Sequence, residues 1–248
     1  PSELWHPLHV IRPDLFPNFW PYARTYCRPR RTPWGFDISG ASNLDKLHAK
    51  LTHPRKGVML RRRKEEVLDQ LPPKRRTVIP LDLKDRREYQ RAVTDFLGWL
   101  AEHSPAKARR AARAQTTVQL GELKRLASHL KLPAVFSWVD DWLMESDEKL
   151  IVFGVHRKIL HALRDRYPGR CVLVDGGVTG RKRQLAVDTF LKKPKCRLFF
   201  GNVRAAGTGW SAPGVSTTAF VELPWSPGDV RQAEDRTHGI ARGQAGTA

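Results

Sequence analysis

The chain has 248 residues, of which 44 are Lys or Arg and 25 are Asp or Glu, so its formal net charge at pH 7 is +19. Such an excess of positive charge predicts a polyanionic partner, with nucleic acid first and an anionic membrane surface second. The 40% hydrophobic content and the eight Trp indicate a globular chain rather than a disordered one, and no apolar run approaches the roughly 18 residues that a membrane span needs.

The cysteines and histidines give no disulfide or metal pattern. Cys27, Cys171 and Cys196 are odd in number and widely spaced, which is typical of reduced, buried thiols in an intracellular protein. The nine His lack zinc-site spacing, and no cleavable signal opens the chain. We expect an intracellular location, either the cytoplasm or nucleoid of a prokaryote or virus-infected cell, or the nucleus of a eukaryote.

Residues 1–57 are rich in proline and aromatic residues. Because proline ends helices, this region predicts short helices separated by prolines, with a loop at 37–44 leading into a helix at about 43–52. We interpret the aromatic side chains as a small core. The alternative is that one of them stacks on an exposed base, as in single-strand binders, the candidates being Trp20, Tyr22 and Trp34.

Residues 58–71 have a helical pattern that Pro72 and Pro73 end. This helix would carry a dense positive patch made of Arg61, Arg62, Arg63 and Lys64. Such a run forms either a solvated face or a contact with phosphate, and the pattern leaves both open.

The next segment predicts a strand at 76–83, with Pro80 at an edge or bulge, and then a helix at about 85–101. Residues 102–114 are typical of an exposed, mobile, basic connector. Two further helices are expected at about 116–130 and 133–145.

From Lys149 onward, apolar runs alternate with helical segments. The runs lie at 150–153, 171–174, 197–200 and 218–223. The helical segments lie at 156–166, 180–191 and around 205–212. Because each apolar run is continuous rather than alternating, the pattern predicts a parallel sheet with helices on both faces.

Ligands of such sheets bind beyond the carboxyl ends of the strands. This rule selects residues 154–156, 175–177, 201–204 and 224–225. After the last run, a Pro/Gly turn leads into Asp229–Arg236, a polar segment with arginine on one side. A buried strand, a turn and a polar helix commonly form phosphate sites in α/β proteins, whereas the alternative for this segment is a solvated charged helix.

These segments resemble, in order and spacing, the second lobe of the Swi/Snf family of DNA-dependent ATPases. The matching motifs are Lys149–Gly154, Asp175-Gly176 with Arg183 and Phe190, Ala206–Ala212, Glu222–Gly228 and Gln232–Arg236. Upstream, residues 15–19, 33–37 and 39–44 resemble the annealing-helicase branch of that family. The resemblance covers nearly the whole chain, and five motifs in the right order make it specific.

The resemblance implies an α/β fold. Residues 133–248 would form the second motor lobe, a RecA-like parallel sheet flanked by helices. Residues 1–75 would be a mainly helical C-terminal remnant of the first lobe, and residues 76–132 would hold a strand, helices and a basic linker between the lobes.

The resemblance also implies the C-terminal half of an ATP-dependent double-stranded DNA translocase or annealing helicase, acting on duplex or branched DNA in DNA repair. The chain contains no Gly-x-x-x-x-Gly-Lys-Ser/Thr loop and no Asp-Glu-x-His box, which would cradle the phosphates and hold Mg²⁺. We therefore expect ATP and Mg²⁺ to be bound mainly by a missing first lobe upstream of Pro1, and the chain alone not to hydrolyse ATP efficiently. The alternative is a non-catalytic, basic DNA-binding module derived from a helicase lobe.

The site residues follow from the same resemblance. Arg236 would be the catalytic arginine finger, which stabilises charge on the transferring phosphoryl group. The ATP-binding residues would be Gln232, Gly207, Gly209 and Arg242, and the DNA-binding residues would be Arg204, Thr208, Arg61, Arg62 and Arg63. An ordinary tight turn remains the alternative for the two glycines, as does an ion pair with Asp188 or Asp175 for Arg183.

The chain departs from the family pattern at one point. Gly239 stands where the family has a second arginine, and the next arginine is Arg242, three residues later. Arg242 would then lie about 4.5 Å further along a continuing helix and about 60° off the expected face. Glycines at 239 and 243 make a break in the helix equally open.

Overall fold

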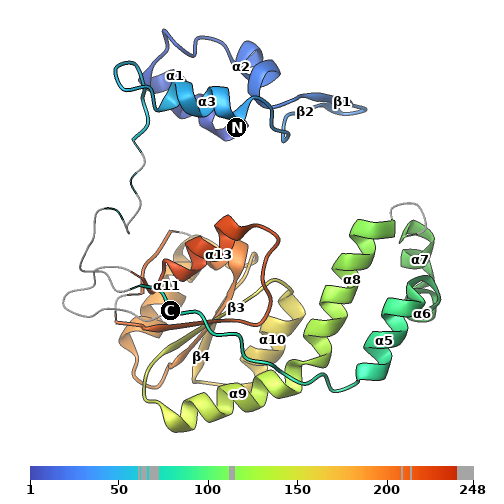
Figure 1. Cartoon of the computed structure of the whole chain (residues 1–248). Helices are drawn as coiled ribbons and strands as arrows, with labels where there is room; N and C mark the ends of the chain where they lie inside the picture. Colours follow the sequence, from blue (N-terminus) through green and yellow to red (C-terminus); the bar gives the residue numbers. More distant parts are fainter. Residues whose placement is uncertain are drawn as a thin grey trace. The chain divides into compact units, whose positions relative to one another are not determined.

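The computed structural model describes residues 1–60, 62, 66, 73–111, 115–207, 209–212 and 214–238. The chain divides into two compact units, Pro1–Asp69 and Gln70–Ala248, and Figure 1 draws both. Each unit has its own hydrophobic core.

The first unit consists of three short helices and a hairpin. The helices are α1 (Ser2–Ile11), α2 (Phe19–Tyr26) and α3 (Leu44–Leu51), and β1 (Arg30–Thr32) pairs antiparallel with β2 (Gly35–Asp37). Its core comprises Leu8, Phe16, Tyr22, Ala23, Cys27, Leu47 and Leu51. The predicted short helices, the helix near 43–52 and the small aromatic core are confirmed.

Three details of this unit differ from the sequence-based prediction. Pro7 lies inside α1, and Pro21 lies in the first turn of α2, where a missing N–H costs nothing. The hairpin was not predicted, because its strands are only three residues long. Tyr22 is 5% exposed and therefore cannot stack on a base. The helix predicted at 58–71 lies largely outside the described residues.

The second unit contains a four-stranded parallel sheet within the described residues. Its strands are β3 (Leu150–Gly154), β4 (Cys171–Val174), β5 (Leu198–Asn202) and β6 (Thr217–Phe220), in the order β4-β5-β3-β6. The predicted runs and their parallel arrangement are confirmed. Because all four strands run the same way, their carboxyl ends meet at one edge.

Alternate residues of the strands supply two separate cores, one on each face. Leu150 and Val152 pack with α9 (Leu132–Glu145) and α10 (Arg157–Arg166), whereas Ile151 and Phe153 belong to the core on the opposite face. That second core includes residues of α11 (Gly180–Lys192), α12 (Val203–Ala206) and α13 (Pro227–Glu234). All five residues of β3 are buried, which is why its sequence is continuously apolar.

In the described part of the second unit, four helices precede α9 and pack around a third core. They are α5 (Arg86–Thr94), α6 (Phe96–His103), α7 (Pro105–Ala111) and α8 (Gln115–Leu130), and their core includes Phe96, Trp99, Leu100, Leu123 and Leu126. Figure 1 shows α8 leading from this group to α9 and the sheet. The predicted helices near 116–130 and 133–145 are confirmed.

Of two predictions in this region, the single helix is wrong, and the connector is mostly exposed over residues 102–108, as predicted, but contains an unpredicted helix. The single helix at 85–101 is broken at Asp95, because the Asp95 carboxylate accepts the Gly98 N–H at 3.0 Å and starts a new helix. The connector at 102–114 contains α7, since alanine-rich residues form helix readily.

The helical segment expected around 205–212 is limited to α12, which ends at Ala206.

The strand predicted at 76–83 is also wrong. Residues 73–83, called the strap below, form no strand. Pro80 cannot donate to a ladder, and the strap is held mainly by side chains, with Leu81 packed against the core that contains Val152. At its end the Lys84 N–H donates to the Leu130 carbonyl at 2.9 Å.

No helix in the described part of the chain is both long enough and apolar enough to cross a membrane. The described cysteines are free thiols, with Cys27 and Cys196 buried and Cys171 half-buried.

Replacing glycine by alanine should change the free energy of unfolding in opposite directions at Gly201, which is tightly packed at the end of β5, and at Gly121, which is in open space on α8. A Cβ at Gly201 would lie 2.9 Å from Ala206 Cβ and 2.9 Å from Phe153 Cε1, in a closed core. We expect Gly201→Ala to lower the free energy of unfolding by about 1–3 kcal/mol, as overpacking does, measured by urea denaturation.

The matched control is Gly121→Ala in the interior of α8, where a Cβ meets nothing within 4 Å. This change should raise stability by up to about 1 kcal/mol, because alanine favours helix over glycine. Equal effects at the two positions would contradict the packing argument.

Candidate functional site

The carboxyl ends of β3 and β6 are joined through the buried carboxylate of Glu222. Its oxygens accept the N–H groups of Val155 at 2.6 Å and His156 at 2.7 Å, and His156 Nδ1 lies 2.7 Å from the same carboxylate. Burial alone would raise the pKa of Glu222, but these hydrogen bonds and one from Ser128 together hold it below its usual value. Glu222 is therefore a charged structural clamp.

The end of β4 is fixed in a similar way by Asp175, which is 3% exposed. Its carboxylate lies 2.8 Å from His161 Nε2 and accepts Arg157 Nε at 2.8 Å, both from α10, and the Gly177 N–H at 2.9 Å. The hydrogen bond with His161 is the main cause that lowers the pKa of Asp175 to about 2, with the Gly177 and Arg157 contacts adding to it.

Asn202 links the ends of β5 and β3. Its side-chain amide donates to the Val155 carbonyl at 2.7 Å, and its oxygen accepts the N–H groups of Arg204 and Ala205 as the cap of α12. Glu222 and Asn202 thus join the ends of β3, β5 and β6, and Asp175 separately joins the end of β4 to α10.

Arg236 joins the segment after α12 to the end of α13. Its Nε donates to the Gln232 carbonyl at 3.0 Å, and its Nη1 donates to the Trp210 carbonyl. The Arg236 carbonyl in turn accepts the Ala212 N–H at 2.8 Å. Burial lowers the pKa of this guanidinium, and the charge of Arg183 lowers it further, against an opposing effect of Asp235.

The two predicted glycines lie in the same segment, and each has a structural requirement. A Cβ at Gly207 would come within 2.2 Å of the Val203 carbonyl oxygen and 3.7 Å from Ala233 Cβ, so α12 and α13 approach closely there. Gly209 has φ +77°, which favours glycine. The tight-turn interpretation therefore applies to Gly209, and close packing applies to Gly207.

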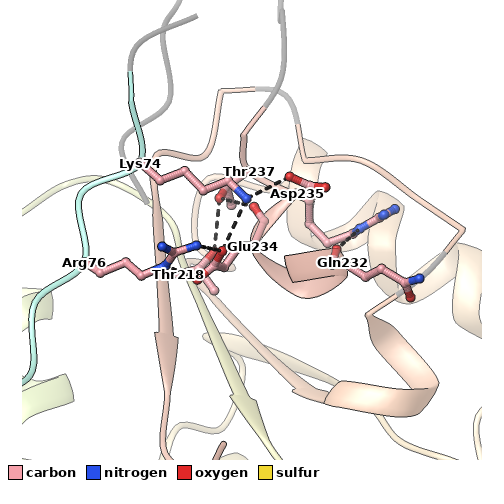
Figure 2. Close-up of polar contacts among 8 residues, drawn as sticks. Lys74, Arg76, Thr218, Gln232, Glu234, Asp235 and Thr237 are labelled. Atoms are coloured by element: carbon pink, nitrogen blue, oxygen red, sulfur yellow. Dashed lines mark hydrogen bonds and ion pairs between the residues drawn. The ribbon is translucent and has the colours of Figure 1, made fainter. Parts of the chain in front are cut away.

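The last turn of α13 is held by the strap, 158 residues away along the chain. Glu234, 4% exposed, accepts Arg76 Nε at 2.7 Å and Nη2 at 2.8 Å, and Lys74 lies 3.3 Å from Glu234 and 2.8 Å from Asp235. Figure 2 shows both cations reaching from the strap to these carboxylates. The Arg76 hydrogen bonds are the first cause of the lowered pKa of Glu234. We call Lys74, Arg76, Glu234 and Asp235 the clasp.

The structure brings four of the predicted site residues together, namely Gly207, Gly209, Gln232 and Arg236. Gln232 is exposed on α13, but Arg236 lies in the turn after the helix, not within it as expected. Arg204 is exposed on α12, and Arg62 is exposed in the first unit. The positions that lie outside the described residues are Arg61, Arg63, Thr208 and Arg242.

Among the described residues, Asp175 binds Arg157 and His161, and Asp188 binds Gln184 and Lys192. Sequence reasoning missed the clasp and the roles of Glu222 and Asn202. Glu222 and Asn202 had a usable signal, since polar residues that end buried strands lie at the ligand edge. The pairing of Arg76 with Glu234 had none.

Two family models together match almost all of this chain. The SNF2-related domain matches residues 1–132, more than half of the chain, and the helicase conserved C-terminal domain matches residues 133–241. The chain belongs to the SNF2-related family. The Swi/Snf resemblance is thereby confirmed, and the parallel sheet with helices on both faces is a RecA-like lobe preceded by a mainly helical segment.

Curated relatives match along 98% of this chain. The human protein named DNA annealing helicase and endonuclease ZRANB3 is 32% identical over 251 residues. A protein of Xenopus tropicalis, named SWI/SNF-related matrix-associated actin-dependent regulator of chromatin subfamily A-like protein 1, is 31% identical over 245 residues. The chain spans 22% of the first relative and 25% of the second, so it corresponds to about a quarter of their length.

Among solved structures, the C-terminal part of the Fun30 ATPase domain matches with a TM-score of 0.42 and 18% identity. The match covers 66% of this chain and 62% of that one.

The clasp predicts a loss of stability when one cation is removed. Arg76→Ala leaves Lys74 as the one cation paired with the buried Glu234 carboxylate among the described residues, so the free energy of unfolding should fall by about 1–2 kcal/mol, measured by urea denaturation. The matched control is Arg75→Ala, an exposed neighbour whose side chain forms no hydrogen bond or ion pair among the described residues. The clasp would be refuted if Arg75→Ala cost as much. Adding Glu234→Gln to Arg76→Ala should recover part of the loss.

The lowered pKa of Asp175 predicts a pH-dependent contribution to stability. Because the folded pKa is about 2 and the ordinary value is 3.8, the unfolded state binds more protons between these values. Asp175 then contributes about 2 kcal/mol above pH ~4, and the contribution disappears as pH falls towards 2. Asp175→Asn should therefore destabilise the protein at pH 7 and much less at pH 2.5. The exposed Asp165→Asn should change stability little at either pH, and a parallel loss in both variants would argue against the Asp175 network.

Proposed function

We propose that this chain is the C-terminal part of an ATP-dependent motor that moves along double-stranded DNA, of the annealing-helicase kind. In this proposal the second lobe presents Arg236 to ATP that a first lobe holds. The observation that carries it is the joining of segments 207–212 and 232–236 through Arg236, because both segments match nucleotide-facing motifs of the family. The names of the relatives, which include an annealing helicase, support the same activity.

The residues present fit one side of a nucleotide. A guanidinium has five N–H donors, and two of those of Arg236 bind carbonyls, so the remaining N–H groups suit phosphate oxygens. The carbonyls fix the plane of the guanidinium before a phosphate arrives. ATP, when bound, would supply the phosphoryl group whose transfer drives movement. ATP and Mg²⁺ would be held mainly by a first lobe, and the chain alone would then hydrolyse ATP poorly.

The proposal keeps the domain limits predicted from the sequence. Residues 1–75 would be the end of the first lobe, 76–132 the region between lobes, and 133–248 the second lobe. The second lobe would contact the phosphate backbone of the DNA. Arg204, which is exposed and follows the end of β5, would make one of these contacts. The net charge of +19 supports a partner rich in phosphate groups. The proposed location is the compartment that holds the cell's DNA, which is the nucleoid or cytoplasm of a prokaryote or virus-infected cell, or the nucleus of a eukaryote.

The test is DNA-stimulated ATPase of this chain with and without the first lobe of a relative added in trans. Arg236→Ala should reduce the reconstituted rate by about 10³-fold or more, as loss of an arginine finger does. Arg236→Lys should also fail, because an ammonium lacks the planar fork. Arg242→Ala should have the smaller effect.

The matched control is Arg231→Ala, which removes an exposed arginine from the same helix. It should retain the wild-type rate, and urea denaturation would show whether each variant is folded. If the added lobe produced no ATPase while the chain still bound duplex DNA, the chain would be the non-catalytic DNA-binding module instead.

A further inference from the structure

The first unit exposes a group of aromatic side chains beside its hairpin. Trp34 is 97% exposed, Phe36 57% and Trp20 46%. Trp34 lies in the two-residue turn between β1 and β2, and it forms no ring contact within the described residues. Figure 1 shows the hairpin projecting from the three helices of this unit. An exposed tryptophan side chain at the tip of a hairpin does not contribute the hydrophobic stabilisation that its burial would give.

The hairpin is joined to the core of its unit through a row of contacting aromatic rings. Trp5 contacts Phe19 at 5.3 Å between centroids, Phe19 contacts Trp20 at 5.6 Å, and Trp20 contacts Phe36 at 5.4 Å. The turn itself is closed by Thr32, whose hydroxyl donates to the Gly35 carbonyl at 3.0 Å. Trp34 is therefore presented on a supported scaffold.

Unpaired arginines lie beside these rings. Residues 24–37 contain four arginines and a single acidic residue, Asp37. Arg31 lies opposite Phe36 in the strand register, so both side chains project from the same face. In the described part of the chain, the side chains of Arg24, Arg28 and Arg31 form no ion pair or hydrogen bond.

We propose that this surface, the hairpin patch of Trp20, Arg31, Trp34 and Phe36, binds single-stranded nucleic acid. An unpaired base would stack on Trp34, and the neighbouring phosphates would bind Arg31. Aromatic faces accept any base, and guanidinium groups pair with phosphate oxygens, which is the chemistry of sequence-tolerant single-strand binding. The charge favours a polyanion over a protein partner, since residues 24–37, which include the hairpin, carry four arginines against one acidic residue. This site is additional to the duplex contact proposed for the second lobe.

The test uses the full chain and a fluorescently labelled oligothymidylate, with binding measured by fluorescence polarisation. Trp34→Ala should weaken binding by about five- to hundred-fold, the range measured for loss of one base–aromatic stack. Trp34→Phe should retain most of the affinity. Trp34→Leu should be as weak as Trp34→Ala, because leucine keeps the apolar bulk but has no π face. Arg31→Gln should reduce the salt slope by about 0.7.

The matched control is Met144→Ala, which removes an apolar side chain that is 78% exposed in the second unit and should not change binding. Unchanged affinity in Trp34→Ala, full affinity in Trp34→Leu, or no binding by the wild-type chain would each overturn the proposal. So would a change of oligomeric state in Trp34→Ala without loss of oligonucleotide binding, which would assign the patch to a second copy. Binding of blunt duplex, measured in parallel, tests the proposed function separately, since it does not depend on Trp34.

Discussion

The candidate site depends on the pairing of buried carboxylates. Burying an ionised carboxylate is costly unless hydrogen bonds and opposite charges replace water, and Asp175, Glu222 and Glu234 each obtain several such partners. Asp175 attaches β4 to α10, Glu222 attaches β6 to the end of β3, and Glu234 attaches α13 to the strap. In a chain with 44 basic and 25 acidic residues, carboxylates used in this way bind only a few of the cations.

The sheet was predictable because burial on both faces imposes one continuous apolar pattern, and β3 and β4 lie where that pattern placed them. Local chemistry that competes with the pattern was harder to foresee. Asp95 lies within a helical pattern, but aspartate is also a preferred N-cap residue. In the structure it caps α6 and ends α5. The strap alternates like a strand, but its polar side chains bind α13 and Pro80 removes a ladder donor. The three-residue strands of the hairpin are too short for periodicity to register.

The site was predictable in its parts and not in its connections. Topology alone placed residues 154–156, 175–177 and 201–204 at one edge. The structure links 154–156 to 201–204 through Asn202 and to the end of β6 through Glu222, whereas Asp175 joins 175–177 to α10. No sequence signal could pair Arg76 with Glu234, because sequence spacing carries no information on a contact 158 residues apart. Arg236 was expected on a helix, yet α13 ends at Glu234. The turn that follows lets its guanidinium reach the Trp210 carbonyl.

The end of α13 and the turn after it combine two ion pairs with the strap and one side-chain bridge within three residues. Glu234 is bound to the strap, Asp235 is bound to Lys74, and Arg236 bridges the end of α13 to the Trp210 carbonyl. The Arg236 N–H also donates to the Ala233 carbonyl at 3.1 Å, which attaches its backbone to the last turn of α13, where Glu234 lies. The strap lies near the start of the second unit in the sequence. Its ion pairs, made by Lys74 and Arg76, are formed with the two residues that directly precede Arg236. Two segments that lie far apart in the sequence therefore set the position of this guanidinium. One is the strap, which precedes α8 in the chain, and the other is the segment at 209–212, which follows α8.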